Sequence, residues 1–69
     1  MRVREIIARY SKLPDAILNA QCRTMGKTPQ ELGAPDLPLL AERVGNAVGM
    51  FTNPAKGREA RQAIEALGQ

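Results

Sequence analysis

The chain has 69 residues, of which 43% are hydrophobic and 25% charged, and it carries a formal net charge of +3. This balance is that of a globular protein, so we do not expect a chain that is disordered throughout. Its single cysteine cannot form an internal disulfide, which favours a cytoplasmic protein over a small secreted domain. One small core is expected at this length, and self-association would add stability to it.

Two helices are predicted in the first part of the chain, at residues 2–11 and 13–25. Pro14 fits the first turn of the second helix, and Gly26 is suited to follow its last turn. Apolar residues at helical spacing mark the faces that we expect to be buried. In the first helix these are Val3, Ile6, Ile7 and Tyr10, and in the second they are Leu13, Ile17, Leu18, Ala20 and Met25.

A one-turn helix is predicted near residues 28–32. Thr28 and Glu31 have the spacing of a capping box, and Pro29 stands at the first helical position. The sequence Gly33-Ala34-Pro35 then stops the helix.

Residues 20–33 also have a weak likeness to a helix-turn-helix motif. Cys22, Gly26 and Thr28 have the order of the small residue, the turn glycine and the hydroxyl residue of that motif. The would-be recognition helix, however, ends after about one turn. A short turn of helix between two longer helices is therefore the favoured interpretation.

The central helix is predicted at residues 36–51, with Asp36 as its N-cap and Pro38 in its first turn. Small residues recur at every fourth position, and such a stripe favours a close approach of another helix backbone. The stripe consists of Ala41, Gly45 and Gly49. In a soluble helix this spacing indicates an internal crossing more often than a dimer interface. The apolar face expected to be buried contains Leu37, Leu40, Val44, Ala47, Val48 and Phe51.

The last helix is predicted at residues 54–67, with Asn53 as its N-cap and Pro54 in its first turn. Its inward residues are Ala60, Ala63, Ile64 and Leu67, and its outward residues are Arg58, Arg61, Gln62 and Glu65. No alternating pattern of a strand is present. We therefore expect an all-α fold, a compact bundle of about four short helices in one domain that spans residues 1–69.

The sequence has no signature of catalysis, metal binding or cofactor binding. Histidine, the commonest general base and metal ligand, is absent. Gly26-Lys27-Thr28 resembles the end of a phosphate-binding loop, but Gln21 stands where that loop needs a glycine. Cys22 is expected to be a buried apolar residue rather than a reactive thiol. We expect no enzyme activity and no cofactor.

Two functions remain open. The first is a protein-interaction or adaptor domain, in which an apolar groove beside Leu39 and Met50 receives a partner helix. The second is a small nucleic-acid-binding or regulatory protein, which would contact phosphates through basic residues at the two ends of the chain. These residues are Arg2, Arg4, Arg9, Lys56, Arg58 and Arg61. The first is favoured, because aromatic residues for base stacking are scarce. The partner is expected to be a protein or a second copy, and no membrane segment is expected because Glu42 and Arg43 interrupt the only long apolar stretch.

Overall fold

The computed structural model describes residues 3–68 and forms, within that range, four α-helices and two short 3₁₀ helices without any strand. The predicted all-α bundle is therefore confirmed. The elements in chain order are α1 (Val3–Ala8), α2 (Pro14–Thr24), η1 (Pro29–Glu31), η2 (Ala34–Asp36), α3 (Leu37–Phe51) and α4 (Pro54–Ala66).

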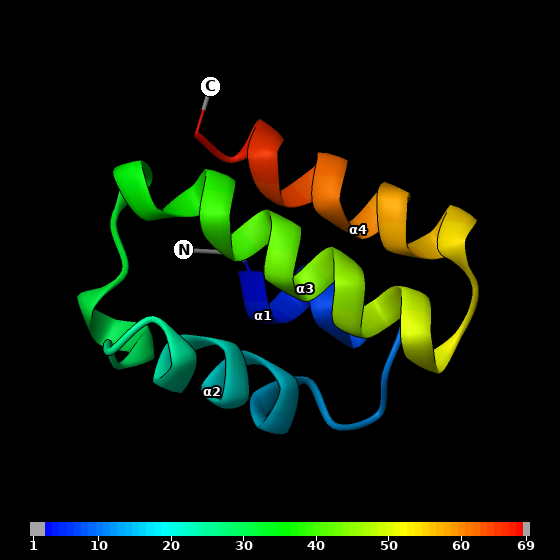
Figure 1. Ribbon diagram of the computed structural model, residues 1–69, viewed down its shortest axis with the longest axis horizontal. Coiled ribbons are helices and arrows are strands. Elements are labelled where there is room, and N and C mark those ends of the chain that lie inside the picture. Colours follow the sequence, from blue (N-terminus) through cyan, green and yellow to red (C-terminus); the bar gives the residue numbers. More distant parts are fainter. Residues whose placement is uncertain (1–2, 69) are drawn as a thin grey trace.

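The helix α3 occupies the centre of the bundle (Figure 1). It lies between α2 and α4, and each of these two helices runs in the opposite direction to α3. The helix α1 lies behind α3 in this view and packs against both α2 and α4. The most extensive packing between two elements is that of α3 against α4.

The core consists of apolar side chains that recur at helical spacing, as the sequence predicts. Each of the four α-helices contributes to it, and among residues 3–68 no polar or charged residue is buried. The buried apolar residues are Val3, Ile6, Ile7, Ile17, Leu18, Cys22, Leu37, Leu40, Ala41, Val44, Val48, Ala60 and Ile64.

Proline, glycine and asparagine set the helix ends. Asn53 caps α4, since its side-chain oxygen accepts a hydrogen bond of 2.9 Å from the backbone N–H of Lys56. Gly26 follows α2 with φ of +72°, a left-handed conformation that glycine adopts without strain. The next N–H, of Lys27, donates to the carbonyl of Cys22 at 3.0 Å and completes a Schellman motif. The caps predicted at these two positions are confirmed.

The first helix is shorter than predicted. α1 ends at Ala8, and the following residues form a tighter turn in which the N–H of Arg9 donates to the carbonyl of Ile6 at 3.1 Å. The predicted one-turn helix is present as the three-residue 3₁₀ helix η1, while η2 was not predicted. With η1 so short, the connection between Gly26 and α3 contains no helix long enough to act as the recognition helix of a helix-turn-helix motif.

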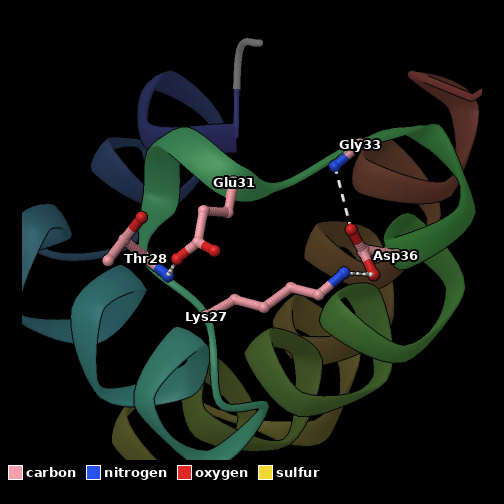
Figure 2. A network of polar contacts seen from close by, with 5 residues as sticks. All are labelled: Lys27, Thr28, Glu31, Gly33 and Asp36. Carbon is pink, nitrogen blue, oxygen red and sulfur yellow. Dashed lines mark hydrogen bonds and ion pairs between the residues drawn. The ribbon is translucent and has the colours of Figure 1, made fainter.

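A polar network ties the connection between α2 and α3 together (Figure 2). Lys27 extends along this connection, and its Nζ lies 2.6 Å from Oδ1 of Asp36. The other carboxylate oxygen of Asp36 accepts a hydrogen bond of 2.9 Å from the N–H of Gly33. The carboxylate of Glu31 turns back and accepts from the N–H of Thr28 at 2.9 Å, as the predicted capping box requires.

Asp36 differs from the prediction in its role. It precedes α3 but makes no side-chain capping bond, so the predicted N-cap interaction is wrong. The physical reason is that η2 leads directly into α3, which gives Asp36 helical dihedral angles (φ −84°, ψ −17°) in place of the extended ones that a capping residue needs. Its carboxylate is instead held by Lys27 and Gly33, and these two donors lower its pKa.

Three side chains that the sequence placed in the core are exposed in the structure. Leu13 is 68% exposed and Phe51 is 73% exposed, and Ala20 is exposed as well. All three line an open groove between α2 and α3. Helical spacing correctly places them on the edges of α2 and α3 that border each other. At this end of the bundle, however, neither helix covers the side chains of the other.

Candidate functional site

The candidate site is the groove between the first half of α2 and the last turns of α3, which we call the α2–α3 groove. It has a volume of about 490 Å³. None of the residues that line it is charged, and most of them are apolar. They are Ser11, Leu13, Ala16, Ile17, Ala20, Gln21, Ala47, Met50 and Phe51.

On the α2 side, the groove is lined by the small residues Ala16 and Ala20 and by one large exposed residue, Leu13. Ala16 and Ala20 are four positions apart, so they lie on the same edge of α2 and leave space above the backbone. Leu13 precedes the helix, and its N–H donates to Oγ of Ser11 at 3.0 Å. This bond fixes the backbone at the mouth of the groove, where Leu13 is exposed.

The α3 side ends in two large apolar residues. Met50 is 87% exposed, and Phe51 is the last residue of α3. Directly after it, both the N–H and the hydroxyl of Thr52 bond to the carbonyl of Val48, at 2.9 and 2.6 Å. The helix ends here because the dihedral angles of Thr52 (φ −121°, ψ −94°) are not helical, and Asn53 then caps α4. No further helical turn therefore follows to cover Phe51.

The α2–α3 groove gathers most of the large exposed apolar side chains of residues 3–68. Four such side chains are exposed in that range, and Leu13, Met50 and Phe51 all line this groove. The fourth, Leu39, is 44% exposed and does not line it. Met50 thus borders an apolar groove as the sequence suggested, whereas Leu39 stands apart from it. An apolar surface of this kind is typical of a protein-interaction site.

Four further hollows in the described part of the chain have a different chemistry. They are smaller, at 220–300 Å³, and each is lined by at least one charged side chain. The largest of these lies along the α3–α4 crossing and is lined in part by Glu42, Arg58 and Arg61. The α2–α3 groove is therefore distinguished from them by both its size and its apolar lining.

The small residues of α3 lie at a close internal crossing. A Cβ atom placed on Gly45 would lie 3.0 Å from the carbonyl oxygen of Gly57 and 3.0 Å from Cβ of Arg61. Gly49 also faces Gly57, and Ala41 is fully buried. Gly45 and Gly49 thus lie against α4, and Ala41 is buried in the core, so this stripe is used within the chain. Gly57 was not singled out from the sequence, although a glycine inside a helix is costly and signals a close contact.

The basic residues proposed for phosphate contacts are spread over several edges of the bundle. Arg4 pairs with Asp15 of α2, and Arg61 pairs with Glu65 at 2.8 Å. Arg9 lines a hollow between α1 and α4, whereas Arg58 lines hollows on the opposite edge of α4. Lys56 is exposed, and Arg2 lies outside the described residues. The structure thus brings Arg58 and Arg61 together in the hollow along the α3–α4 crossing, but it places Arg4 and Arg9 elsewhere.

Cys22 is part of the core. Its side chain is 1% exposed, and burial, assisted by the negative charge of Asp36, raises the pKa of the thiol. A raised pKa keeps the sulfur in the unreactive thiol form at neutral pH. Among residues 3–68, no group of three His, Cys, Asp or Glu side chains is placed to hold a metal ion.

Comparisons with family models, with curated proteins and with solved structures find no match for this chain. In the described part of the chain, every helix is too short or too polar to span a bilayer.

Proposed function

We propose that this chain is a non-enzymatic interaction domain of the cytoplasm that binds an amphipathic helix of a partner protein in the α2–α3 groove. The observation that supports this best is the gathering of Leu13, Met50 and Phe51 around a groove that no charged residue lines. In a chain of 69 residues, so much exposed apolar surface costs solubility, and a partner would remove it from water.

A helix suits the shape of the groove. The groove follows two antiparallel helices, and its small floor residues Ala16, Ala20 and Ala47 leave room for the side chains of a third helix. Its volume of about 490 Å³ is within the ordinary range of binding pockets in proteins. Amphipathic helices bind such grooves through apolar residues spaced i, i+3, i+4 and i+7.

The spread of the basic residues favours this function over nucleic-acid binding. Phosphate contacts need several cations on one surface. Here Arg4 and Arg61 are paired with carboxylates, and Arg9 and Arg58 line hollows on opposite edges of α4. A nucleic-acid ligand therefore has fewer free cations on any one face than the sequence suggested.

The proposal can be tested by selecting binders from a display library of helical peptides. The library has apolar residues at i, i+3, i+4 and i+7, and Glu, Gln or Lys at the remaining positions. We expect selected peptides to bind the chain and to lose about tenfold or more affinity for the variant Phe51→Asp. The variant Leu39→Asp is the matched control, since it places the same charge on α3 outside the groove and should bind almost normally.

Failure to recover any helical binder would contradict the proposal, as would equal weakening by the two variants. Titration of labelled duplex and single-stranded DNA tests the alternative. Nucleic-acid binding would weaken with salt with a log–log slope of about −3 to −5. Such a slope, found without peptide binding, would replace the proposed function.

A further inference from the structure

The two ends of the α2–α3 groove differ in chemistry. Leu13, Met50 and Phe51 form the apolar end. Toward the other end, the same edges of the two helices continue into arginines. Arg23 follows Ala20 by three positions on α2, and Arg43 precedes Ala47 by four positions on α3. At helical spacing these arginines flank the groove one turn beyond its floor.

These two arginines have no anionic partner in the described part of the chain. The ion pairs formed among residues 3–68 are those of Arg4, Lys27 and Arg61, and none involves Arg23 or Arg43. Arg43 is half-buried, and its Nε is buried without any acceptor. A guanidinium without an anionic partner can still form charge-assisted hydrogen bonds to a carboxylate through its terminal N–H groups.

The neighbouring carboxylates are engaged elsewhere. Asp15 of α2 is held by Arg4 on the α1 side. Asp36 is held at 2.6 Å by Lys27. Lys12 adjoins the apolar end, between the lining residues Ser11 and Leu13. Positive charge therefore flanks the groove, although its floor is neutral.

We propose that the occupant of the groove is an acidic amphipathic helix, whose apolar residues lie against Leu13, Met50 and Phe51 and whose carboxylates meet Arg23 and Arg43. This inference rests on the proposed function and specifies its partner. Leu13 and Arg23 are ten positions apart, which corresponds to about 15 Å along a helix. The partner therefore carries Asp or Glu about two to three turns from its first apolar anchor.

A second copy of this chain is a poorer occupant. A two-fold pair joins identical surfaces. In one alignment of the two copies, Arg23 and Arg43 would face Arg23 and Arg43 of the second copy. In the opposite alignment, they would face Lys12 of the second copy. Both arrangements bring like charges together and weaken association.

The peptide library described above tests this inference through its charged positions. We expect the selected peptides to be enriched in Glu and depleted in Lys at the positions two to three turns from the first anchor. Synthetic peptides with the same apolar face and Glu, Gln or Lys there give the affinities directly. The Glu peptide should bind about threefold to tenfold more tightly than the Lys peptide at low salt, with a smaller difference at high salt.

Matched variants separate a local effect from one of net charge. Arg23→Glu should remove or reverse the preference for the Glu peptide, whereas Arg58→Glu, the same change on α4, should leave it almost unchanged. Arg43→Gln should reduce it without adding a negative charge. Equal effects of Arg23→Glu and Arg58→Glu would overturn the inference.

The outcomes also separate this inference from the proposed function. Tight binding of all three peptides without a charge preference would overturn the acidic partner and leave the groove as a helix-binding site. Absence of any peptide binding would overturn both. Sedimentation that shows a dimer, dissociated by Phe51→Asp, would assign the groove to a second copy instead.

Discussion

Gly57 of α4 lies directly against the carbonyl of Gly45 of α3: a Cβ atom at position 57 would stand 2.5 Å from that oxygen. It would also stand 3.0 Å from Cα of Gly49. Both neighbours are backbone atoms, so no side chain can move aside to make room. The close packing of α3 against α4, the most extensive interface in the fold, therefore depends on the absence of a side chain at residue 57.

Replacement of Gly57 by alanine should destabilise the fold. The added methyl group forces α3 and α4 apart, and overpacking of this kind costs about 1–3 kcal/mol. The better helix propensity of alanine returns at most about 1 kcal/mol. Thermal unfolding followed by circular dichroism measures the difference. Gly49→Ala is the control, since its nearest contacts would be at 3.9 Å and its melting temperature should equal or exceed that of the wild type.

Gly45→Ala should fall between these two variants. Its Cβ would lie at 3.0 Å from one backbone oxygen, a tight contact that is still longer than that at Gly57. The sequence alone left open whether alanine at this position would stabilise the helix, and the structure predicts a loss. Equal melting temperatures for Gly45→Ala, Gly57→Ala and the wild type would show that the crossing is looser than described.

Removal of the Asn53 cap should destabilise α4. Its side chain satisfies the N–H of Lys56, one of the free donors of the first turn. Asn53→Ala should cost about 0.5–2 kcal/mol, whereas Asn53→Asp keeps an acceptor and should be nearly neutral. Chemical denaturation of both variants measures this. A cost for aspartate as large as that for alanine would show that the contact is not a cap.

The ion pair between Lys27 and Asp36 should make the stability depend on pH in acid. The pKa of Asp36 is lower in the folded chain than its ordinary value, chiefly because of Lys27 and then of the N–H of Gly33. Its contribution is therefore complete above the ordinary pKa and is lost as the pH falls through the folded pKa. Asp36→Asn should be less stable than the wild type at neutral pH, and the two should converge in acid. Curves that stay parallel through acid would contradict this assignment.

The thiol of Cys22 should be protected in the folded protein. Because the side chain is buried and its pKa is raised, we expect a thiol reagent to react with Cys22 only when the chain unfolds. With a stability of about 3 kcal/mol, labelling would be roughly a hundredfold slower than in denaturant. Thr24→Cys in a Cys22→Ala background provides an exposed control on the same helix. Equally fast labelling at the two positions would show that Cys22 is accessible.

Several helix ends were predictable from the sequence because local interactions set them. Pro14 and Pro54 begin helices, Gly26 ends one, and Asn53 caps another, all through backbone geometry within a few residues. Asp36 was not predictable in this way, since its side chain had competing donors. The bond from Lys27, nine positions away, depends on the path of the whole connection.

The groove was only partly predictable. Its residues are apolar and at helical spacing, which is also the pattern of a core. Whether Leu13 and Phe51 are covered depends on the distance between α2 and α3 at that end, a tertiary property that no local pattern encodes. The one available signal was their position next to chain turns, where a helix has no further turn to shield them. Gly57 was overlooked for a related reason, since its partners Gly45 and Gly49 come from another helix.

The central claim is that the α2–α3 groove binds an acidic amphipathic helix, and an NMR titration tests it most directly. The ¹⁵N-labelled chain is titrated with the Glu peptide, and the backbone amide shifts are followed residue by residue. We expect saturable shifts at residues 13–23 and 43–51, with those of residues 56–66 almost unchanged. Shifts concentrated in residues 56–66, or no saturable shifts at all, would contradict it.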